Sequence, residues 1–197
     1  MTGTAEIRRA GAAEAGAIAG LIATAFEPLD VSRWLVPDPA PRRATLAGNF
    51  RILVEYALEH GHADLIGDRA AAVWLPQEAG VELPPPPDYD ARLLAACGPY
   101  TDRFRALDDA FEANHPHEPH HHLVFLAVHP ASQGQGLGAS LLRHHHARLD
   151  ADGTAAYLEA SSLRAAALYE REGYRHRGSP FHLPDGPPFH PMWRDPV

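Results

Sequence analysis

The chain has 197 residues, 45% of them hydrophobic, and a formal net charge of −8 at pH 7. This length fits one domain that can bury most of its apolar surface, and the single Cys97 excludes an internal disulfide. The acidic balance argues against non-specific nucleic-acid binding. All basic residues are arginines, which excludes chemistry that needs a lysine, such as a Walker A loop or a Schiff base.

The start of the chain, MTGTAEIRRAGAAEAG, has acidic residues and no apolar block before a cleavage site, so we expect no signal peptide. No run of 18 apolar residues occurs, which predicts no membrane span. We therefore expect a cytosolic protein with one domain over residues 1–197, present as a monomer or homodimer.

Hydrophobic periodicity predicts the elements in chain order. In the first half we expect a strand at 6–10, helices at 12–26 and 42–60, hairpin strands at 63–66 and 70–75, and helices at 91–97 and 100–113. The second half predicts a strand at 123–128, a helix at 137–149, a strand at 155–160, a helix at 163–172 and two tail strands around a turn at 184–186. This order indicates a mixed α/β fold around one sheet.

The most informative stretch is 123–138, LVFLAVHPASQGQGLG, in which an apolar strand leads into a glycine-rich turn that opens a helix. Gly134, Gly136 and Gly138 alternate, so backbone N–H groups can approach phosphate oxygens, and the start of a helix favours the same anion. Residues 120–149 contain no Asp or Glu but include Arg143 and Arg148. The stretch therefore predicts a site for a phosphate-bearing ligand.

One interpretation is a dinucleotide fold, because Gly134-x-Gly136-x-x-Ala139 fits a permissive glycine pattern and Glu159 follows about 20 residues later. Three features oppose it. The segment HPASQ separates the turn from its strand, little chain follows Glu159, and the preceding residues show no doubly wound alternation.

The other interpretation rests on a family resemblance. The segment 133–138, QGQGLG, has the Q/R-x-x-G-x-G/A form and resembles the GNAT superfamily of acetyltransferases. The segments 126–130 (LAVHP), 157–161 (YLEAS) and 167–174 (ALYEREGY) resemble that family's central strand and second half-motif, in the same order. Residues 118–196 further resemble the puromycin N-acetyltransferases, whereas 1–117 match only in the order of elements.

The resemblance implies the GNAT fold, which is one mixed, mostly antiparallel sheet with a splayed parallel strand pair, flanked by helices. It also implies that acetyl-CoA is the donor substrate and that the acceptor is a primary amine of a small molecule, an aminonucleoside or aminoacyl antibiotic being one candidate. Two alternatives stay open: a protein or peptide N-acetyltransferase, and a catalytically weak CoA-binding module. Ala165 motivates the last of these, because many relatives have Asn after the residue equivalent to Arg164.

The same resemblance implies which residues hold the donor. The pantetheine arm would lie along Leu126, Ala127 and Val128, whose amide region would polarise the thioester carbonyl. The pyrophosphate would lie on the turn and the start of the helix, at Gln133, Gly134, Gln135, Gly136, Leu137, Gly138 and Ala139.

Acyl transfer also needs an acid and a base. Tyr169 stands where the family often places the acid for the departing thiolate, and its phenol pKa of about 10 is close to that of a thiol; packing under the cofactor is its structural alternative. The base is either Glu159 or His120, and His120 shares a strand face with His122. Their structural alternatives are a hydrogen-bond acceptor for Glu159 and a solvated strand end for the histidines.

The 14 histidines raise the question of a metal. His144, His145 and His146 are consecutive on a helix and cannot converge on one ion. His115, His117 and Glu118 lie in a loop but match no known ligand spacing. The sequence therefore predicts no metal site.

Overall fold

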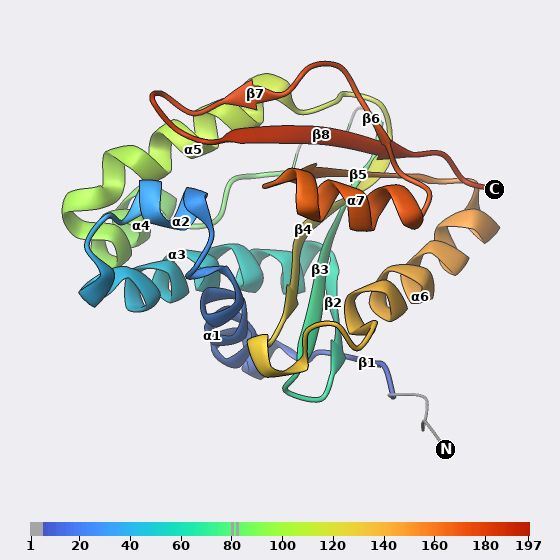
Figure 1. The fold of residues 1–197 in the computed structure, drawn as a ribbon, viewed down its shortest axis with the longest axis horizontal. Helices are drawn as coiled ribbons and strands as arrows, with labels where there is room; N and C mark the ends of the chain where they lie inside the picture. The colour runs from blue at the N-terminus through green and yellow to red at the C-terminus, as the bar shows by residue number, and fades with distance from the viewer. Residues whose placement is uncertain (1–5, 80, 82) are drawn as a thin grey trace.

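The computed structural model describes residues 6–79, 81 and 83–197 of the chain (Figure 1). Residues 1–5, at the start of the segment in which no signal peptide is expected, lie outside the described residues. The strands are β1 (Arg8–Arg9), β2 (His62–Ile66), β3 (Ala70–Gln77), β4 (His120–Val128), β5 (Ala155–Ala160), β6 (Arg175–His176), β7 (Phe181–His182) and β8 (Pro188–Arg194). The α-helices are α1 (Ala15–Phe26), α2 (Asp30–Leu35), α3 (Pro39–His60), α4 (Tyr89–Cys97), α5 (Thr101–Asn114), α6 (Leu137–Asp152) and α7 (Leu163–Arg171).

The described strands form one sheet in the order β1-β2-β3-β4-β5-β8-β6, with β7 added on β8. β4 and β5 run parallel, and the other neighbours that pair are antiparallel. A dinucleotide fold needs a largely parallel, doubly wound sheet, so this topology excludes that interpretation. The expected mixed sheet with one parallel pair is confirmed.

Helices cover both faces of the sheet (Figure 1). On one face α1 and α3 pack over a core that includes Phe50, Val73 and Phe125. On the other face α6 and α7 pack over a second core that includes Trp74, Leu142 and Leu158. β4 contributes side chains to both cores, because successive side chains of a strand point to opposite faces of the sheet.

Most expected elements form, and the differences have local causes. α3 begins at Pro39 rather than at residue 42, since the Asp38 carboxylate accepts a hydrogen bond from the Ala40 N–H at 2.9 Å and proline fits the first turn of a helix. The tail contains the three strands β6, β7 and β8 rather than two.

β4 is longer than expected because the histidines before Leu123 belong to it. His120, His121 and His122 pair with β3 on one side and with β5 on the other. Their interpretation as a solvated strand end is wrong, since His120 is only 1% exposed. Pairing on both sides explains this burial, which hydrophobic periodicity could not indicate.

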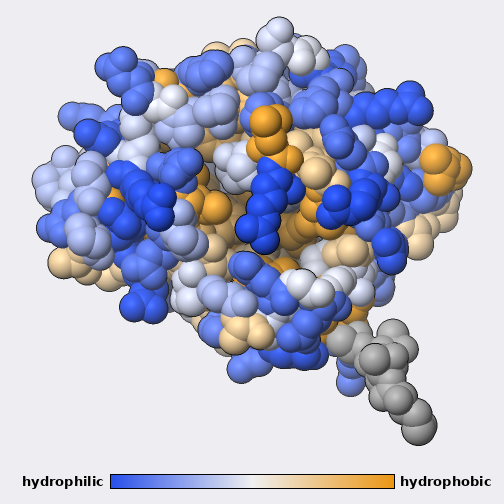
Figure 2. Space-filling model, in the orientation of Figure 1, coloured by the Kyte–Doolittle hydropathy of each residue, from blue (hydrophilic) through white to orange (hydrophobic). Residues whose placement is uncertain are grey.

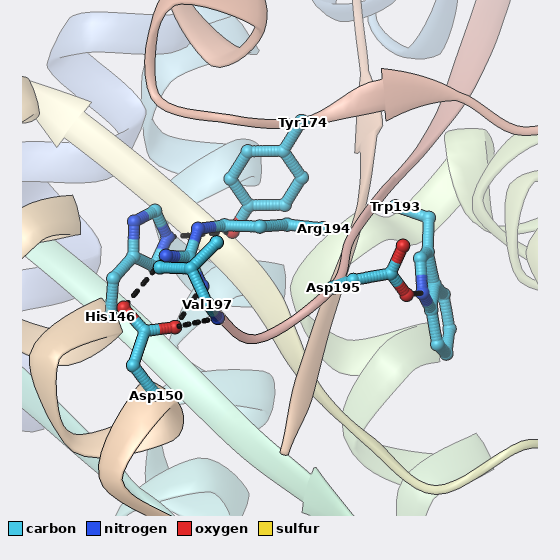
Figure 3. A network of polar contacts seen from close by, with 7 residues as sticks. All are labelled: His146, Asp150, Tyr174, Trp193, Arg194, Asp195 and Val197. Atoms are coloured by element: carbon cyan, nitrogen blue, oxygen red, sulfur yellow. Dashed lines mark hydrogen bonds and ion pairs between the residues drawn. The ribbon is translucent and has the colours of Figure 1, made fainter. Parts of the chain in front are cut away.

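A polar network fastens the C-terminal strand to α6 (Figure 3). Arg194 on β8 donates two hydrogen bonds to Asp150 on α6, both at 2.8 Å, and the Val197 N–H donates to the same carboxylate. One turn earlier on α6, His146 Nε2 lies 3.1 Å from the Tyr174 hydroxyl. Paired bonds of this kind fix orientation, so β8 and α6 are held together next to β5. Within the described part of the chain, no helix is both long and apolar enough to cross a membrane.

Candidate active site

The site begins where β4 and β5 part. Their parallel pairing runs only from His120 opposite Ala155 to His122 opposite Tyr157. β4 stays paired with β3 as far as Val128, so in the described chain residues 123–128 have no strand partner on the β5 side. Figure 2 shows a hollow in the middle of this face of the molecule, with hydrophobic side chains inside it and hydrophilic ones around it.

A bulge shapes β4 inside this site. Val73 lies opposite Phe125 but Trp74 lies opposite Leu123, so Val124 is an extra residue in β4. A bulge bends its strand and increases the local twist. This is one physical reason why β4 turns away from β5 just after the paired residues.

The glycine turn stands at the end of β4. Gly134 and Gly136 have φ values of 76° and 78°, a conformation that is costly for a residue with a side chain. Gln133 folds back, and its Nε2 donates to the Val128 carbonyl at 3.2 Å. Gly138 has an ordinary backbone and packs on Leu126 and Val128, since a Cβ there would lie 3.5 Å and 3.6 Å from their side chains.

The turn leads directly into α6, whose N-terminal cap is Gly136. The first N–H groups of a helix have no partner within the helix and form a positive end. Residues 133–136 are exposed, whereas Leu137 and Gly138 are buried. The backbone from 134 to 139 is thus able to bind a phosphate group.

The arginines expected to support that anion are placed elsewhere. Arg143 donates two hydrogen bonds to the Glu172 carboxylate, at 2.7 and 2.9 Å, so its charge is already paired with an acidic side chain. Arg148 lines a separate cavity and lies 11 residues beyond the start of α6, which is about 16 Å along a helix. The absence of acidic residues over 120–149 therefore does not indicate an arginine-built anion site.

A histidine–carboxylate cluster spans the point where the strands separate. His122 Nε2 on β4 lies 2.8 Å from Glu159 Oε2 on β5, and His115 Nδ1 lies 3.8 Å from Glu159 Oε1. The Glu159 side chain is 2% exposed. Burial by itself raises the pKa of this carboxyl, but the charges and hydrogen bonds of His122 and His115 outweigh it and keep the pKa below its ordinary value. Glu159 is thus held as a carboxylate.

His120 lies on the same strand face but makes different contacts. Its Nδ1 lies 2.7 Å from the Glu118 carbonyl oxygen, so Nδ1 carries the hydrogen and Nε2 keeps a lone pair. Nε2 is buried and has no hydrogen-bond partner among the residues described. Burial lowers the pKa of His120 to about 4, which leaves this ring neutral at physiological pH and weakly basic.

Tyr169 lies on α7, beside the core that α6 also covers. Its ring packs edge-on against Tyr174 with ring centroids 5.8 Å apart, and the residue is partly buried. Burial raises the pKa of the phenol, so Tyr169 holds its proton at neutral pH. At the start of α7 the Ser162 hydroxyl accepts a hydrogen bond from the Ala165 N–H at 3.1 Å, so this helix is capped even though residue 165 is not Asn.

Sequence reasoning singled out Glu159 and His120 but missed the pairing of Glu159 with His122. The i, i+2 spacing already placed His120 and His122 on one face. The register of β4 against β5 decides which of the two histidines contacts Glu159. The residues of either strand alone do not indicate that register. The sequence groups His115 with His117 and Glu118 in one loop, whereas the structure places His115 beside Glu159 and pairs Glu118 with Arg177 at 2.7 Å.

Comparisons with known proteins agree with this geometry. A family model described as "Acetyltransferase (GNAT) domain" matches residues 104–176. Comparison with curated proteins gives no match. A solved structure from Corynebacterium glutamicum, described as histone acetyltransferase HPA2 and related acetyltransferase, is 29% identical, with 97% of this chain and 96% of that one covered and a TM-score of 0.73.

Two insect enzymes show the same fold at lower identity. The polyamine N-acetyltransferase of Drosophila melanogaster is 17% identical over 96% of this chain and 99% of its own, with a TM-score of 0.61. Arylalkylamine N-acetyltransferase 2 of Aedes aegypti is 10% identical over 96% of this chain and 98% of its own, also with a TM-score of 0.61. The two insect structures show the fold alone. The family match over residues 104–176 and the Corynebacterium glutamicum structure, together with the parted parallel strands and the glycine turn, identify the chain as an acetyltransferase with the GNAT fold.

Proposed function

We propose that this enzyme transfers an acetyl group from acetyl-CoA to a primary amine of a small molecule. The observation that carries the proposal is the parting of β4 from β5 after His122, with a glycine turn and a helix start at the far end of the same strand. The unpaired edge of β4 is therefore followed directly by backbone N–H groups that can bind a phosphate. Acetyl-CoA has a matching order of groups, because its pantetheine arm can pair with a strand edge and its pyrophosphate follows that arm.

The donor would lie along this strand edge and the glycine turn. The free edge of β4 at Leu126, Ala127 and Val128 would pair with the amide groups of pantetheine in the way a further strand pairs. The N–H groups from Gly134 to Ala139 would hold the pyrophosphate. The bond from Gln133 to the Val128 carbonyl supports this placement, because it fixes the turn relative to the strand end.

The reaction requires the amine nitrogen to attack the thioester carbon and to lose a proton as the C–S bond breaks. We assign the proton acceptor to His122, with Glu159 as its positioning residue. His122 Nε2–H donates to the Glu159 carboxylate at 2.8 Å, which leaves Nδ1 with the lone pair that takes the amine proton, directly or through water. His120 is the alternative base. Its burial and lowered pKa favour His122 instead.

Tyr169 is the proposed acid. As the tetrahedral intermediate collapses, the sulfur leaves as a thiolate and takes the phenol proton, so the amide and free CoA are formed. Burial keeps this phenol protonated until that step. Its position on α7, which packs against β5, supports the role because α7 borders the parted strands.

The acceptor class is inferred from similarity. The solved relatives include enzymes named for polyamines and for arylalkylamines, and residues 118–196 resemble the puromycin N-acetyltransferases. An amine on a small molecule, including an aminonucleoside antibiotic such as puromycin, is therefore the acceptor that we propose. The rings of His115 and His122 are partly exposed and have centroids 4.9 Å apart, so they would provide a wall for an aromatic acceptor.

The test measures CoA thiol release with DTNB for a panel of polyamines, arylalkylamines, puromycin and amine-bearing peptides, with mass spectrometry of each product. Saturable release with a small amine and an acetylated product supports the proposal. Release with peptides alone would assign the enzyme to protein or peptide acetylation. Saturable binding of acetyl-CoA in calorimetry without turnover on any amine would indicate a CoA-binding module.

A further inference from the structure

A second cluster of metal-ligand side chains lies on the sheet face that α6 covers. His62 and Asp64 are two residues apart on β2, so both point to this face. His145 reaches them from α6, where its ring lies 4.8 Å from that of His62 between centroids. His121 also belongs to this face, since it alternates on β4 with His120 and His122 of the candidate active site.

The separations within this cluster suit one metal ion. His62 Nε2 and Asp64 Oδ2 are 3.5 Å apart, and one ligand atom from each of His62, Asp64 and His145 lies within 4.8 Å of the others. Four-coordinate zinc with bonds of about 2.0–2.2 Å places its ligand atoms roughly 3.3 Å apart. The first two atoms already have nearly this separation, and metal binding would draw the His145 nitrogen closer to them.

These side chains are buried without adequate partners. Asp64 is 0% exposed, His145 2% and His62 9%. Both Asp64 oxygens, His62 Nε2 and His145 Nδ1 have no hydrogen-bond partner in the part of the chain that is described. Arg9 approaches Asp64 Oδ1 at 3.2 Å but is itself half-exposed. Buried charged and polar groups are costly unless they are paired or bound to a metal, and one cation would satisfy all three residues.

The surroundings of His145 match those of a metal ligand. Its Nε2 lies 3.0 Å from His121 Nδ1, and its ring stacks on Trp74 with centroids 4.2 Å apart. Ligating histidines commonly donate their other ring N–H to a second partner, which leaves the first nitrogen free for the metal.

A cavity of about 470 Å³ opens onto this cluster, and it provides an entry path and room for a water ligand. Its lining includes Arg9, His62, His121, His145, Arg148 and Asp152.

We propose that His62, Asp64 and His145 bind one divalent transition-metal ion, with two imidazoles, one carboxylate and water as ligands, and that this ion ties α6 to β2. The ligand set suits Zn²⁺. This site is separate from the acetyl-transfer site and does not depend on the proposed function. It also differs from the sequence-based expectation of no metal, because the three ligands come from segments that no spacing rule joins.

The test uses the full chain after removal of metal with EDTA. Titration with Zn²⁺ in a calorimeter should show one tight site and raise the midpoint of thermal unfolding, and Co²⁺ should give the visible absorption bands of a site with nitrogen and oxygen ligands. Asp64→Asn and His145→Gln should each weaken Zn²⁺ binding by about 100-fold or more. His144→Gln is the matched control, since His144 is the exposed neighbour on the same helix, and it should leave the affinity unchanged.

Glu159→Gln separates this site from the other group of possible ligands, His115, His122 and Glu159. It should not change the tight Zn²⁺ site. The proposal is overturned if the tight site survives Asp64→Asn and His145→Gln, if Glu159→Gln removes it, or if the folded wild-type chain gives neither Zn²⁺ binding nor Co²⁺ bands. If Asp64→Asn does not fold, His62→Gln replaces it, because it removes a ligand while leaving the carboxylate and its contact with Arg9 in place.

Discussion

Replacing Glu159 with glutamine tests the proposed base most directly. The change keeps the shape of the side chain and removes the negative charge that lies 2.8 Å from His122 Nε2. A hydrogen bond to a charged group contributes about 1.5–3 kcal/mol, and each 1.36 kcal/mol is a factor of ten in rate. We therefore expect kcat/KM for the amine to fall by roughly 10- to 150-fold.

The assay is steady-state CoA release with the best amine, for Glu159→Gln, His122→Asn and the double variant. If Glu159 acts by positioning His122, the two residues work as a unit, and the double variant should be no slower than the slower single variant. CoA affinity from calorimetry and the free energy of unfolding from urea titration show whether each variant keeps its donor site and its fold.

Two results would refute this reasoning. Unchanged turnover in a folded Glu159→Gln enzyme would remove the carboxylate from the mechanism, and fully additive losses in the double variant would separate it from His122. A larger loss of kcat in His120→Asn than in His122→Asn would assign the base to His120, whose Nε2 also carries a lone pair.

The remaining predictions concern the acid, the glycine turn and pH. Tyr169→Phe, folded and able to bind CoA, should lose most of its kcat, and unchanged turnover would show that the ring only packs. Gly136→Ala should lower CoA affinity, and it should lower the free energy of unfolding by about 1–2 kcal/mol, because a φ of 78° is costly for alanine. Calorimetry measures the CoA affinity and urea titration measures the free energy of unfolding. Unchanged values would show that alanine is not strained at this position. Burial lowers the pKa of His146 to about 4, below its unfolded value, so its contribution to stability is present above about pH 6.5 and lost as the pH falls toward 4. Between about pH 4.5 and 6, His146→Gln should therefore show a slope of unfolding free energy against pH that is about 1 kcal/mol per unit smaller than in the wild type, and equal slopes would exclude the effect.

The sequence by itself determined the features that depend on neighbouring residues. The periodicity of 42–60 and 137–149 located α3 and α6, and the alternating glycines located the turn after β4, because helix spacing and positive φ values leave local marks in a sequence. The motif at 133–138 also indicated the GNAT fold before any contact was known. These features need no knowledge of how distant segments pack.

Only the tertiary structure decided the partners of the polar side chains. His122 and Glu159 are 37 residues apart, and Arg143 is matched by Glu172, 29 residues later. Helix spacing shows only that His145 cannot share one ion with His144 and His146, whereas the fold places it beside His62 and Asp64 of β2. Strand register and the docking of α6 on the sheet decide these contacts, and both depend on packing across the whole domain rather than on spacing along the chain.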